Sequence, residues 1–562
     1  MADTVRKQVD QRLSQLRNER SRGWETNWRD LSDFIEPRTG RWNLSDANEG
    51  QRRDQKIINS TATYSARVLE AGMMSGITSP ARPWFKFATP DPSLMKYGPV
   101  KIWLHQVEIA MREVFIKSNL YNALPTIYGE EGIFGSAAMV AMADEKDMVR
   151  FYPFTVGSYF LANSSRNQVD TIYREFRMTA RQMIQQFGNE GVSTTVRNMA
   201  DQNSETWIDV CHAIEPRAER EKSRKDSKNM PFQSVYWEKG GDADKVLRES
   251  GFREFPGMAP RWKVNGEDVY GSGPGALAIG DIKALQLMER RKAEMIEKGV
   301  RPPMTAPESL RNQKASIVPG DITYVNIQQG MQGFMPTYEV DPNWLQGLRG
   351  EINAHEGRIK TAFFEDLFLM IAQMETVRTA TEIAARKEEK MLMLGPVLER
   401  LNDELLDPLI NRTFSLMLEQ SAPIWAGLLP GKPLLPPPPE ELAGVDLRIE
   451  YISILAQAQK ALGVASIERT LGFAGNLAGM DPSVLDKINM DQSMDEYTAM
   501  IGAPPTILRN NEEVAQIRKA RAEAQQQQAQ TEQLGQGVQA AKLLSETDVS
   551  RPSALTTLAG GY

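Results

Sequence analysis

The residues whose types and spacing could bind a ligand most directly are glycines. The segment 271–276 (GSGPGA) fits the pattern G-x-G-x-x-[G/A], in which backbone amides at a helix N-terminus approach a pyrophosphate. The run before it, 264–270, is too polar for a buried parallel strand, and the acidic residues about 20 positions further on, Glu289 and Glu294, fall within a helical pattern. The sequence therefore favours a glycine-rich turn into a helix, and a nucleotide-binding enzyme that uses Gly271 to Gly275 is the alternative.

Three other groups contain residue types that can bind metals, transfer protons or bind phosphate, but their spacing does not match any of these kinds of site. The single cysteine excludes a disulfide framework, and Cys211 with His212 lacks the further ligands of a zinc site. His355 lies on an apolar helical stripe, which favours a packed or interface histidine over an acid–base group. Gly431 and Lys432 are followed by proline rather than Ser or Thr, so they do not form a phosphate-binding P-loop. We expect no cofactor, no metal and no reaction of the chain's own.

The composition is that of a globular protein with several domains. The 562 residues are 41% hydrophobic and 25% charged, and the length suggests about three or four domains. Residues 1–12 are polar, which argues against a signal peptide, and no run of about 18 apolar residues could span a membrane. The net charge of −7 argues against a protein that grips nucleic acid over most of its surface, but it allows one past which nucleic acid slides.

The elements that must carry these residues are organised around two long helical patterns, 274–299 and 343–371. Apolar residues recur in them at steps of three, four or seven: Ile282, Leu285, Met288 and Met295 in the first, and Leu345, Leu348, Ile352, Ile359, Phe363, Leu367 and Met370 in the second. At ~1.5 Å per residue these rods are roughly 35–45 Å long. The insert 301–341 is rich in proline and has β-type runs at 315–318 and 322–327. One pair of amphipathic helices cannot bury two faces, so we expect copies of the hairpin packed side by side in a ring or bundle.

The remaining segments predict an α+β domain over 1–270, in which helices come first and the sheet later. A helical stripe over 5–35 has a basic face (Arg6, Lys7, Arg12, Arg17, Arg20 and Arg22), which we interpret as a solvated face rather than a nucleic-acid contact. Further helices are expected at 59–74, 100–117, 123–134, 180–187 behind the N-cap Thr179, 455–469 and 483–501, and strands at 137–143, 151–159, 168–177, 205–210, 233–238, 246–252 and 445–452. Pro396 and Pro408 should kink a long helix that reaches about residue 420. The Gln- and Ala-rich tail, 512–544, cannot fold alone.

An ordered set of phrases along the chain resembles a known family. The phrases are AGMMSGITSPARPWF at 71–85, FGSAA at 134–138, VDTIYR at 169–174 with Gln182, YGSGPG at 270–275, TATE at 379–382, YISILA at 451–456 and GAPP at 502–505. Together they resemble the portal, or head-to-tail connecting, proteins of short-tailed bacteriophages. The resemblance runs from about residue 20 to residue 520, in the right order.

The resemblance implies an α+β, mostly helical protomer with a wing, a stem, a clip and a crown, which forms a ring with a central channel. The implied divisions are a wing at 1–270, stem helices at 271–299 and 343–371, a clip at 300–342, a tunnel loop at 372–382, a wing helix and β connector at 383–454, a crown at 455–510 and a C-terminal tail or barrel at 511–562. In this fold the glycine segment leads into a stem helix.

The function that the resemblance implies is that of a dodecameric ring at one capsid vertex. Such a ring passes double-stranded DNA during packaging and ejection without hydrolysing ATP, which agrees with the missing P-loop. It docks the large subunit of the terminase and then a tail adaptor or nozzle protein, and it contacts major capsid and scaffolding proteins. The protein is then a virion component assembled in the host cytoplasm, with no membrane partner. An internal virion protein ejected with the DNA is a further alternative, which explains the Gln-rich tail but not the hairpin.

The resemblance also assigns residues to three kinds of site. The DNA channel is expected at Met370, Gln373, Glu375 and Arg378 of the tunnel loop. The subunit interface of the stem is expected at Ile282, Leu285, Ile352, His355 and Ile359. Terminase and adaptor docking is expected at Pro307, Leu310, Arg311 and Lys314 of the clip.

Overall fold

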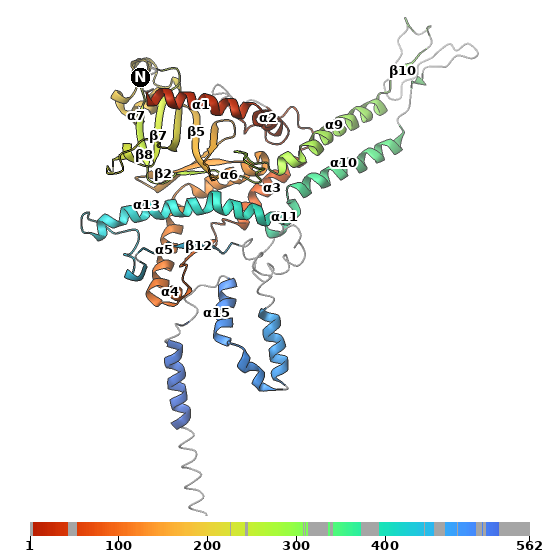
Figure 1. Cartoon of the computed structure of the whole chain (residues 1–562). Helices are drawn as coiled ribbons and strands as arrows, with labels where there is room; N and C mark the ends of the chain where they lie inside the picture. The colour runs from red at the N-terminus through yellow and green to blue at the C-terminus, as the bar shows by residue number, and fades with distance from the viewer. Residues whose placement is uncertain are drawn as a thin grey trace, which may run out of the picture.

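The computed structural model describes residues 4–42, 53–224, 226–241, 245–306, 308, 311–312, 335–337, 341–372, 393–442, 444–453, 467–479, 481–501, 509 and 513–527. Figure 1 shows a body from which a helical hairpin projects, with further helices on the opposite side. The hairpin consists of α9 (Pro274–Val300) and α10 (Pro342–Ala362), and at its outer end β10 (Met304–Thr305) pairs with β11 (Met335–Pro336). The helices on the opposite side are 467–478, η5 (Pro482–Lys487), α15 (Met490–Ile501) and 513–527.

A five-stranded antiparallel sheet forms one layer of the body. Its order is β4 (Tyr159–Asn163), β5 (Val169–Thr179), β6 (Trp207–Pro216), β7 (Phe232–Glu238) and β8 (Arg248–Phe252). Along a strand successive side chains point to opposite faces. Cys211 therefore packs under α1 (Val5–Ser21), whereas its neighbour Val210 packs under α7 (Ala180–Gly191) and α8 (Thr194–Gln202).

The larger core of the body is helical. It is built from α2 (Trp24–Phe34), α3 (Thr61–Gly76), α5 (Gly98–Lys117), α6 (Leu120–Phe134), helix 393–401, η3 (Asn402–Leu406) and α13 (Asp407–Trp425). Two small sheets complete it: β3 (Met148–Phe154), β2 (Ala138–Asp144) and β9 (Gly257–Met258), and the pair β1 (Phe85–Ala88) and β12 (Arg448–Tyr451). Short helical turns lie at α4 (Pro92–Lys96), η1 (Ser227–Asn229) and η4 (Glu440–Leu442).

The second rod of the hairpin is broken rather than continuous to residue 371. α10 ends at Ala362, Phe364 takes a left-handed φ of 56°, and α11 (Glu365–Ala372) follows in a new direction. The apolar spacing continues across the break because both helices pack on α3. A Cβ on Gly72 of α3 would lie 2.3 Å from the Phe368 ring, so this glycine permits the close approach of α11.

The basic face predicted for the first helix is solvated only in part. Lys7 and Arg22 are exposed, but Arg6 and Arg20 are 3% and 2% exposed. Arg20 Nη1 donates to the carbonyl oxygens of Gly157 at 2.7 Å and Tyr159 at 2.8 Å. The prediction is wrong for these two arginines because α1 lies on the sheet, which covers part of its polar face as well as its apolar stripe.

Other sequence predictions have mixed outcomes. The capping box of Thr179 with Gln182 is confirmed, with Gln182 N donating to Thr179 Oγ1 at 3.3 Å. The single strand predicted at 151–159 is wrong, since it covers the end of β3, a turn and the first residue of β4. The expected helix at 483–501 is divided into η5 and α15. The predicted strands at 315–318 and 322–327 lie outside the described residues.

Candidate functional site

The glycine segment packs against the end of α6 at the base of the hairpin. A Cβ on Gly271 would lie 2.4 Å from the carbonyl oxygen of Gly135, and one on Gly275 would lie 2.3 Å from that of Ile133. A Cβ on Gly273, the N-cap of α9, would lie 2.7 Å from the carbonyl oxygen of Glu131. These glycines therefore serve backbone-to-backbone packing, which agrees with a turn into a helix. The segment 264–270 before them is not a strand.

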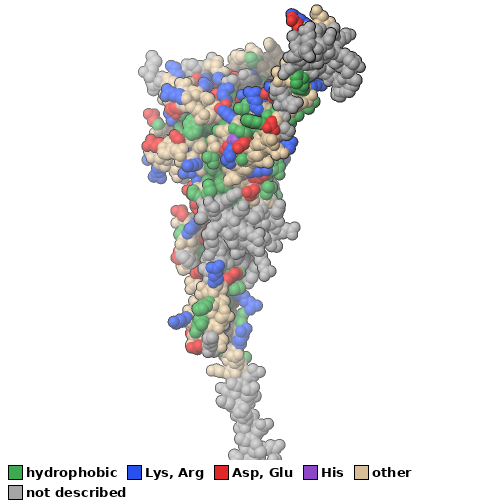
Figure 2. Space-filling model, turned by 90° about the vertical axis from the view of Figure 1, so that its right-hand side faces the viewer, with side chains coloured by type: hydrophobic (Ala, Val, Ile, Leu, Met, Phe, Trp, Pro, Cys, Tyr) green, Lys and Arg blue, Asp and Glu red, His purple; other side chains and the backbone are tan. Residues whose placement is uncertain are grey.

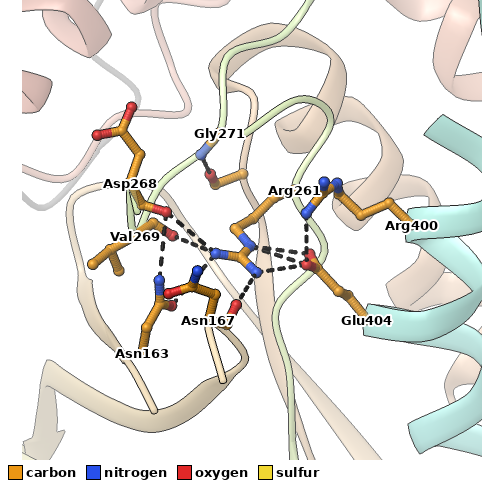
Figure 3. Close-up of polar contacts among 9 residues, drawn as sticks. Asn163, Asn167, Arg261, Asp268, Val269, Gly271, Arg400 and Glu404 are labelled. Carbon is orange, nitrogen blue, oxygen red and sulfur yellow. Dashed lines mark hydrogen bonds and ion pairs between the residues drawn. The ribbon is translucent and has the colours of Figure 1, made fainter. Parts of the chain in front are cut away.

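Arg261 holds the loop that leads to this turn. Its side chain is 2% exposed, and Nη2 donates to Glu404 Oε1 at 2.6 Å and to the Asn167 carbonyl at 3.0 Å. Nη1 donates to the carbonyl oxygens of Asp268 at 3.4 Å and Val269 at 3.3 Å. Figure 3 shows Glu404 reaching the guanidinium from one side and the loop carbonyls lying on the other. Arg261 thus joins the loop before α9 to the long helix that contains Glu404.

Glu404 lies in a π-helical turn within that long helix. Pro408 has no N–H with which to bond the carbonyl of residue 404, and its ring clashes with that carbonyl in a regular α-helix. The chain responds with the wider turn η3, in which the Asp407 amide donates to the Asn402 carbonyl. The predicted effect of Pro408 is confirmed as this local change. Arg400, one turn earlier, adds a second cation 3.2 Å from Glu404 Oε1.

A second carboxylate is buried beside this ion pair. Glu131 of α6 is fully buried, and neither of its carboxylate oxygens has a hydrogen-bond partner among the described residues. Burial, and to a smaller extent the negative charge of Glu404, raise the pKa of Glu131 to about 8. The base of the hairpin therefore contains a carboxyl group whose charge is costly.

A polar clamp holds α9 to the beginning of α3. Gln286 is 5% exposed, and its Oε1 accepts hydrogen bonds from the amides of Ile58 at 2.7 Å and Asn59 at 2.8 Å. Its Nε2 donates to the Asn59 carbonyl at 2.9 Å. Asn59 Nδ2 in turn donates to Glu356 of α10 at 2.8 Å. Both helices of the hairpin are therefore anchored to the same point of the body.

The residues predicted for the stem interface have an intramolecular role instead. Ile282 and Leu285 of α9 and Ile352 and Ile359 of α10 are 0% to 4% exposed and belong to one hydrophobic cluster. They have no surface left to offer a second copy, because the two helices cover each other, α2 and α6 also pack on α9, and α3 packs on α10. His355 is half-buried between the helices, with Nδ1 2.8 Å from Asp281 Oδ1.

The other predicted site residues fall mainly outside the described part of the chain. Met370 lies in the last turn of α11, whereas Gln373, Glu375 and Arg378 lie outside the described residues. At the tip of the hairpin, Arg311 lies in an exposed turn, and Pro307, Leu310 and Lys314 are likewise outside.

Sequence reasoning missed the outer faces of the hairpin. On α9, opposite Ile282, lie Leu277 at 77% exposed, Gly280, Ala284 and Leu287 at 54% exposed. On α10, opposite Ile352, the exposed residues include Gly347, Gly350, Ala354, Gly357 and Thr361, and Trp344 is 71% exposed at their flank. Nothing lies within 4 Å of a Cβ built on any of the glycines on these two faces. Their spacing of three and four residues is the signal in the sequence, but a stripe defined by large apolar side chains does not include glycine or alanine.

The surface around the base of the hairpin carries both signs of charge. Figure 2 shows Lys and Arg interspersed with Asp and Glu on this face of the body. Every helix that the structure describes is too short or too polar to cross a bilayer. Within the same described residues, no three His, Cys, Asp or Glu side chains gather so that they could hold a metal ion.

Comparisons with known proteins agree along the whole chain. The family model described as bacteriophage head to tail connecting protein matches residues 6–508. The chain is 51% identical over 563 residues to the portal protein of Salmonella phage epsilon15, an alignment that covers 100% of this chain and 99% of the relative. It is 43% identical over 561 residues to the probable portal protein of Bordetella phage BPP-1, again covering 100% and 99%.

Proposed function

The chain belongs to the bacteriophage head to tail connecting protein family and has a portal function, and on this premise we propose that its copies form a closed ring at one capsid vertex. The ring is dodecameric, as the family resemblance implies, and double-stranded DNA passes through its centre during packaging and ejection. The chain then acts by position and shape, without a reaction of its own.

One observation supports the ring proposal: each helix of the hairpin is buried on the face toward the other helix and solvent-exposed on the opposite face. The α9 face presents Leu277 and Leu287 on either side of Gly280, and the middle of the exposed α10 face presents Gly347, Gly350, Ala354 and Gly357, with the larger Trp344 exposed at its flank. Each glycine within a helix costs about 0.5–1 kcal/mol relative to alanine. The glycines of α10 gain nothing in a single copy, but in a ring they let the backbone of a neighbouring helix approach.

The two bare faces differ, so the contact between copies is heterologous. Leucine side chains of α9 in one copy fit against the small-residue face of α10 in the next, as knobs fit into holes. A heterologous contact repeats around an axis and closes into a ring when the rotation permits. The proposed stem interface therefore moves from Ile282, Leu285, Ile352 and Ile359 to the opposite sides of the same helices.

The rest of the chain takes the parts that the family resemblance implies. The body forms the wing, the tip at 300–342 forms the clip, and 455–510 forms the crown. Arg311 and its neighbours in the clip dock the terminase and then the tail adaptor. Arg378 and Glu375 line the channel and touch DNA transiently, because a ring of mixed charge lacks the cumulative grip of a basic collar. Capsid and scaffolding proteins contact the wing during assembly in the host cytoplasm.

The ring proposal is tested by placing a charge on the bare α9 face. Leu287→Asp should leave the protomer folded, since the side chain is 54% exposed. In the ring it buries an unpaired carboxylate at every contact, which costs several kcal/mol per site and leaves monomers or small oligomers in light scattering.

The matched control is Leu428→Asp, because Leu428 is 77% exposed and follows α13, whose C-terminal end Figure 1 shows on the side of the body away from the hairpin. This variant should assemble like the wild type. Wild-type protein that stays monomeric at all concentrations and salts contradicts the ring, and normal rings from Leu287→Asp move the interface to another face.

A further inference from the structure

A second helix of the body has a bare apolar face that neither the fold nor the stem contact uses. On α5, Val107 and Met111 face the core, whereas Ile102, Ile109 and Ile116 are 61%, 40% and 62% exposed. These three isoleucines are seven residues apart, so they form one stripe along about 21 Å of the helix. We call this stripe the isoleucine seam.

The seam has no explanation within one copy. Isoleucine is a weaker helix former than Leu, Ala or Lys, so helix propensity does not favour it at exposed positions. A repeat of seven with β-branched residues at equivalent positions is the pattern that packs against another helix. One edge of the seam carries the partly exposed Lys101 and Arg112, which would attract an acidic partner helix, whereas Glu113, between Ile109 and Ile116, pairs with Lys117 at 4.0 Å.

The chain itself contains a helix with matching properties. α15 has Asp491, Asp495 and Glu496 and no basic residue. It also presents Met490 and Met494 on one face, at 49% and 53% exposed. Methionine adapts its shape to a neighbouring surface, and the two acidic edge residues lie one turn apart beside it. Because the seam and the methionines are both exposed, they do not cover each other within one copy.

We propose that the isoleucine seam of one copy docks α15 of the adjacent copy, through Met490 and Met494 and with Asp495 beside the basic edge. The proposal rests on the ring described above and adds a second contact level to it. Figure 1 shows α5 and α15 on the side of the body opposite the hairpin. Rotation about a ring axis brings equal levels of neighbouring copies side by side, so α15 of one copy can reach α5 of the next.

The test is a cross-link between two differently tagged full-length copies. One copy carries Ile109→Cys and the other carries Met494→Cys; the native Cys211 is buried. The copies are mixed before assembly and oxidised, and the expected product is a disulfide-linked pair that contains both tags. The control replaces Ile109→Cys with Trp207→Cys, which is 57% exposed in the wild type and lies at the start of β6, where it pairs with Thr179 at the entry to α7. This control should give no linked pair.

Charge reversal supplies an independent readout. Arg112→Glu alone and Asp495→Arg alone should each weaken the contact about two- to five-fold, as expected for a solvent-exposed ion pair. The two changes together should restore it.

The remaining outcomes overturn the proposal and separate it from the ring. A disulfide that forms only within a chain carrying both cysteines assigns α15 to its own copy. Absence of any disulfide, while light scattering shows wild-type assemblies, refutes the α5 contact and leaves the ring intact. Monomeric wild-type protein removes the ring and this contact together.

Discussion

Arg261 is the residue whose loss should change the base of the hairpin most. In Arg261→Met the apolar chain keeps a similar volume, but Glu404 loses the guanidinium 2.6 Å away. Among the residues that the structure describes, it then pairs only with Arg400, whose side chain is 36% exposed. Breaking a buried ion pair by removing one partner costs about 3–5 kcal/mol. Three loop carbonyls also lose a donor. We take about 3–5 kcal/mol as the total free-energy cost of the substitution, because the ion pair and the hydrogen bonds belong to one network and their contributions are not additive.

The cost should appear as local opening of the loop 262–271. A tenfold change corresponds to about 1.4 kcal/mol, so amide hydrogen exchange there should become roughly 100- to 4,000-fold faster. Peptides covering 262–273 and 400–406, measured by mass spectrometry, report both sides of the contact. Peptides of β6 and β7, which lie in the other layer of the body, should keep the wild-type rate.

Arg400→Met is the matched control, since it removes the more exposed cation from the same carboxylate. An exposed pair contributes about 0–1 kcal/mol, so exchange in 262–271 should rise by no more than about five-fold. Equal effects of the two substitutions, or wild-type exchange in Arg261→Met, would refute the role assigned to Arg261. Uniform acceleration over the whole chain would mean that the variant unfolds globally.

Two further predictions concern the same region. The pKa of Glu131 is raised to about 8 in the folded protein. Between the ordinary glutamate pKa and pH 8 the folded state therefore binds more protons than the unfolded state. The free energy of unfolding should fall as pH rises through that window. Glu131→Gln should therefore match the wild type near pH 5 and have the higher melting temperature near pH 9; identical differences at both values would contradict this. Gly275→Ala places a Cβ 2.3 Å from a backbone carbonyl and should cost about 1–3 kcal/mol, whereas Gly280→Ala meets nothing within 4 Å and should gain up to about 1 kcal/mol. Thermal unfolding at low protein concentration compares the two variants. Equal melting temperatures of Gly275→Ala and Gly280→Ala would show that the glycine turn is not tightly packed.

Local patterns in the sequence predicted the elements well but not which side of each element would be covered. The periodicity of 274–299 gives α9 almost to the residue, and Thr179 begins the helix that its capping box predicts. The stripe that includes Ile282 is apolar as predicted, yet α10, α2 and α6 of the same copy cover it, where the prediction placed a neighbouring copy. Periodicity reports that a face is buried and contains no information about the chain that buries it.

The remaining misses depend on contacts between residues far apart in the sequence. In the sequence Arg20 does not differ from a surface arginine, because the carbonyl groups of residues 157 and 159 that bind it are distant along the chain. Phe363 and Leu367 continue one apolar spacing across the break, so the left-handed turn at Phe364 is explained only by the packing of both α10 and α11 on α3. Glu404 was unremarkable in sequence, although Pro408 four residues later was recognised as a disruption of the helix. The glycine motif was interpreted correctly because its local context, a polar run before it, already argued against a nucleotide site.

The pairing of β1 with β12 determines when the body can close during synthesis. Ala88 pairs with Arg448, and these residues are 360 positions apart. At about 5–20 residues per second, the ribosome needs roughly 20–70 s to deliver β12 after β1 has emerged. During that interval the edge of β1 lacks its partner strand, and an unpaired edge can recruit other chains. A nascent chain that stops before Arg448 therefore cannot close the body, so the proposed assembly into a ring would have to wait for copies that are nearly complete.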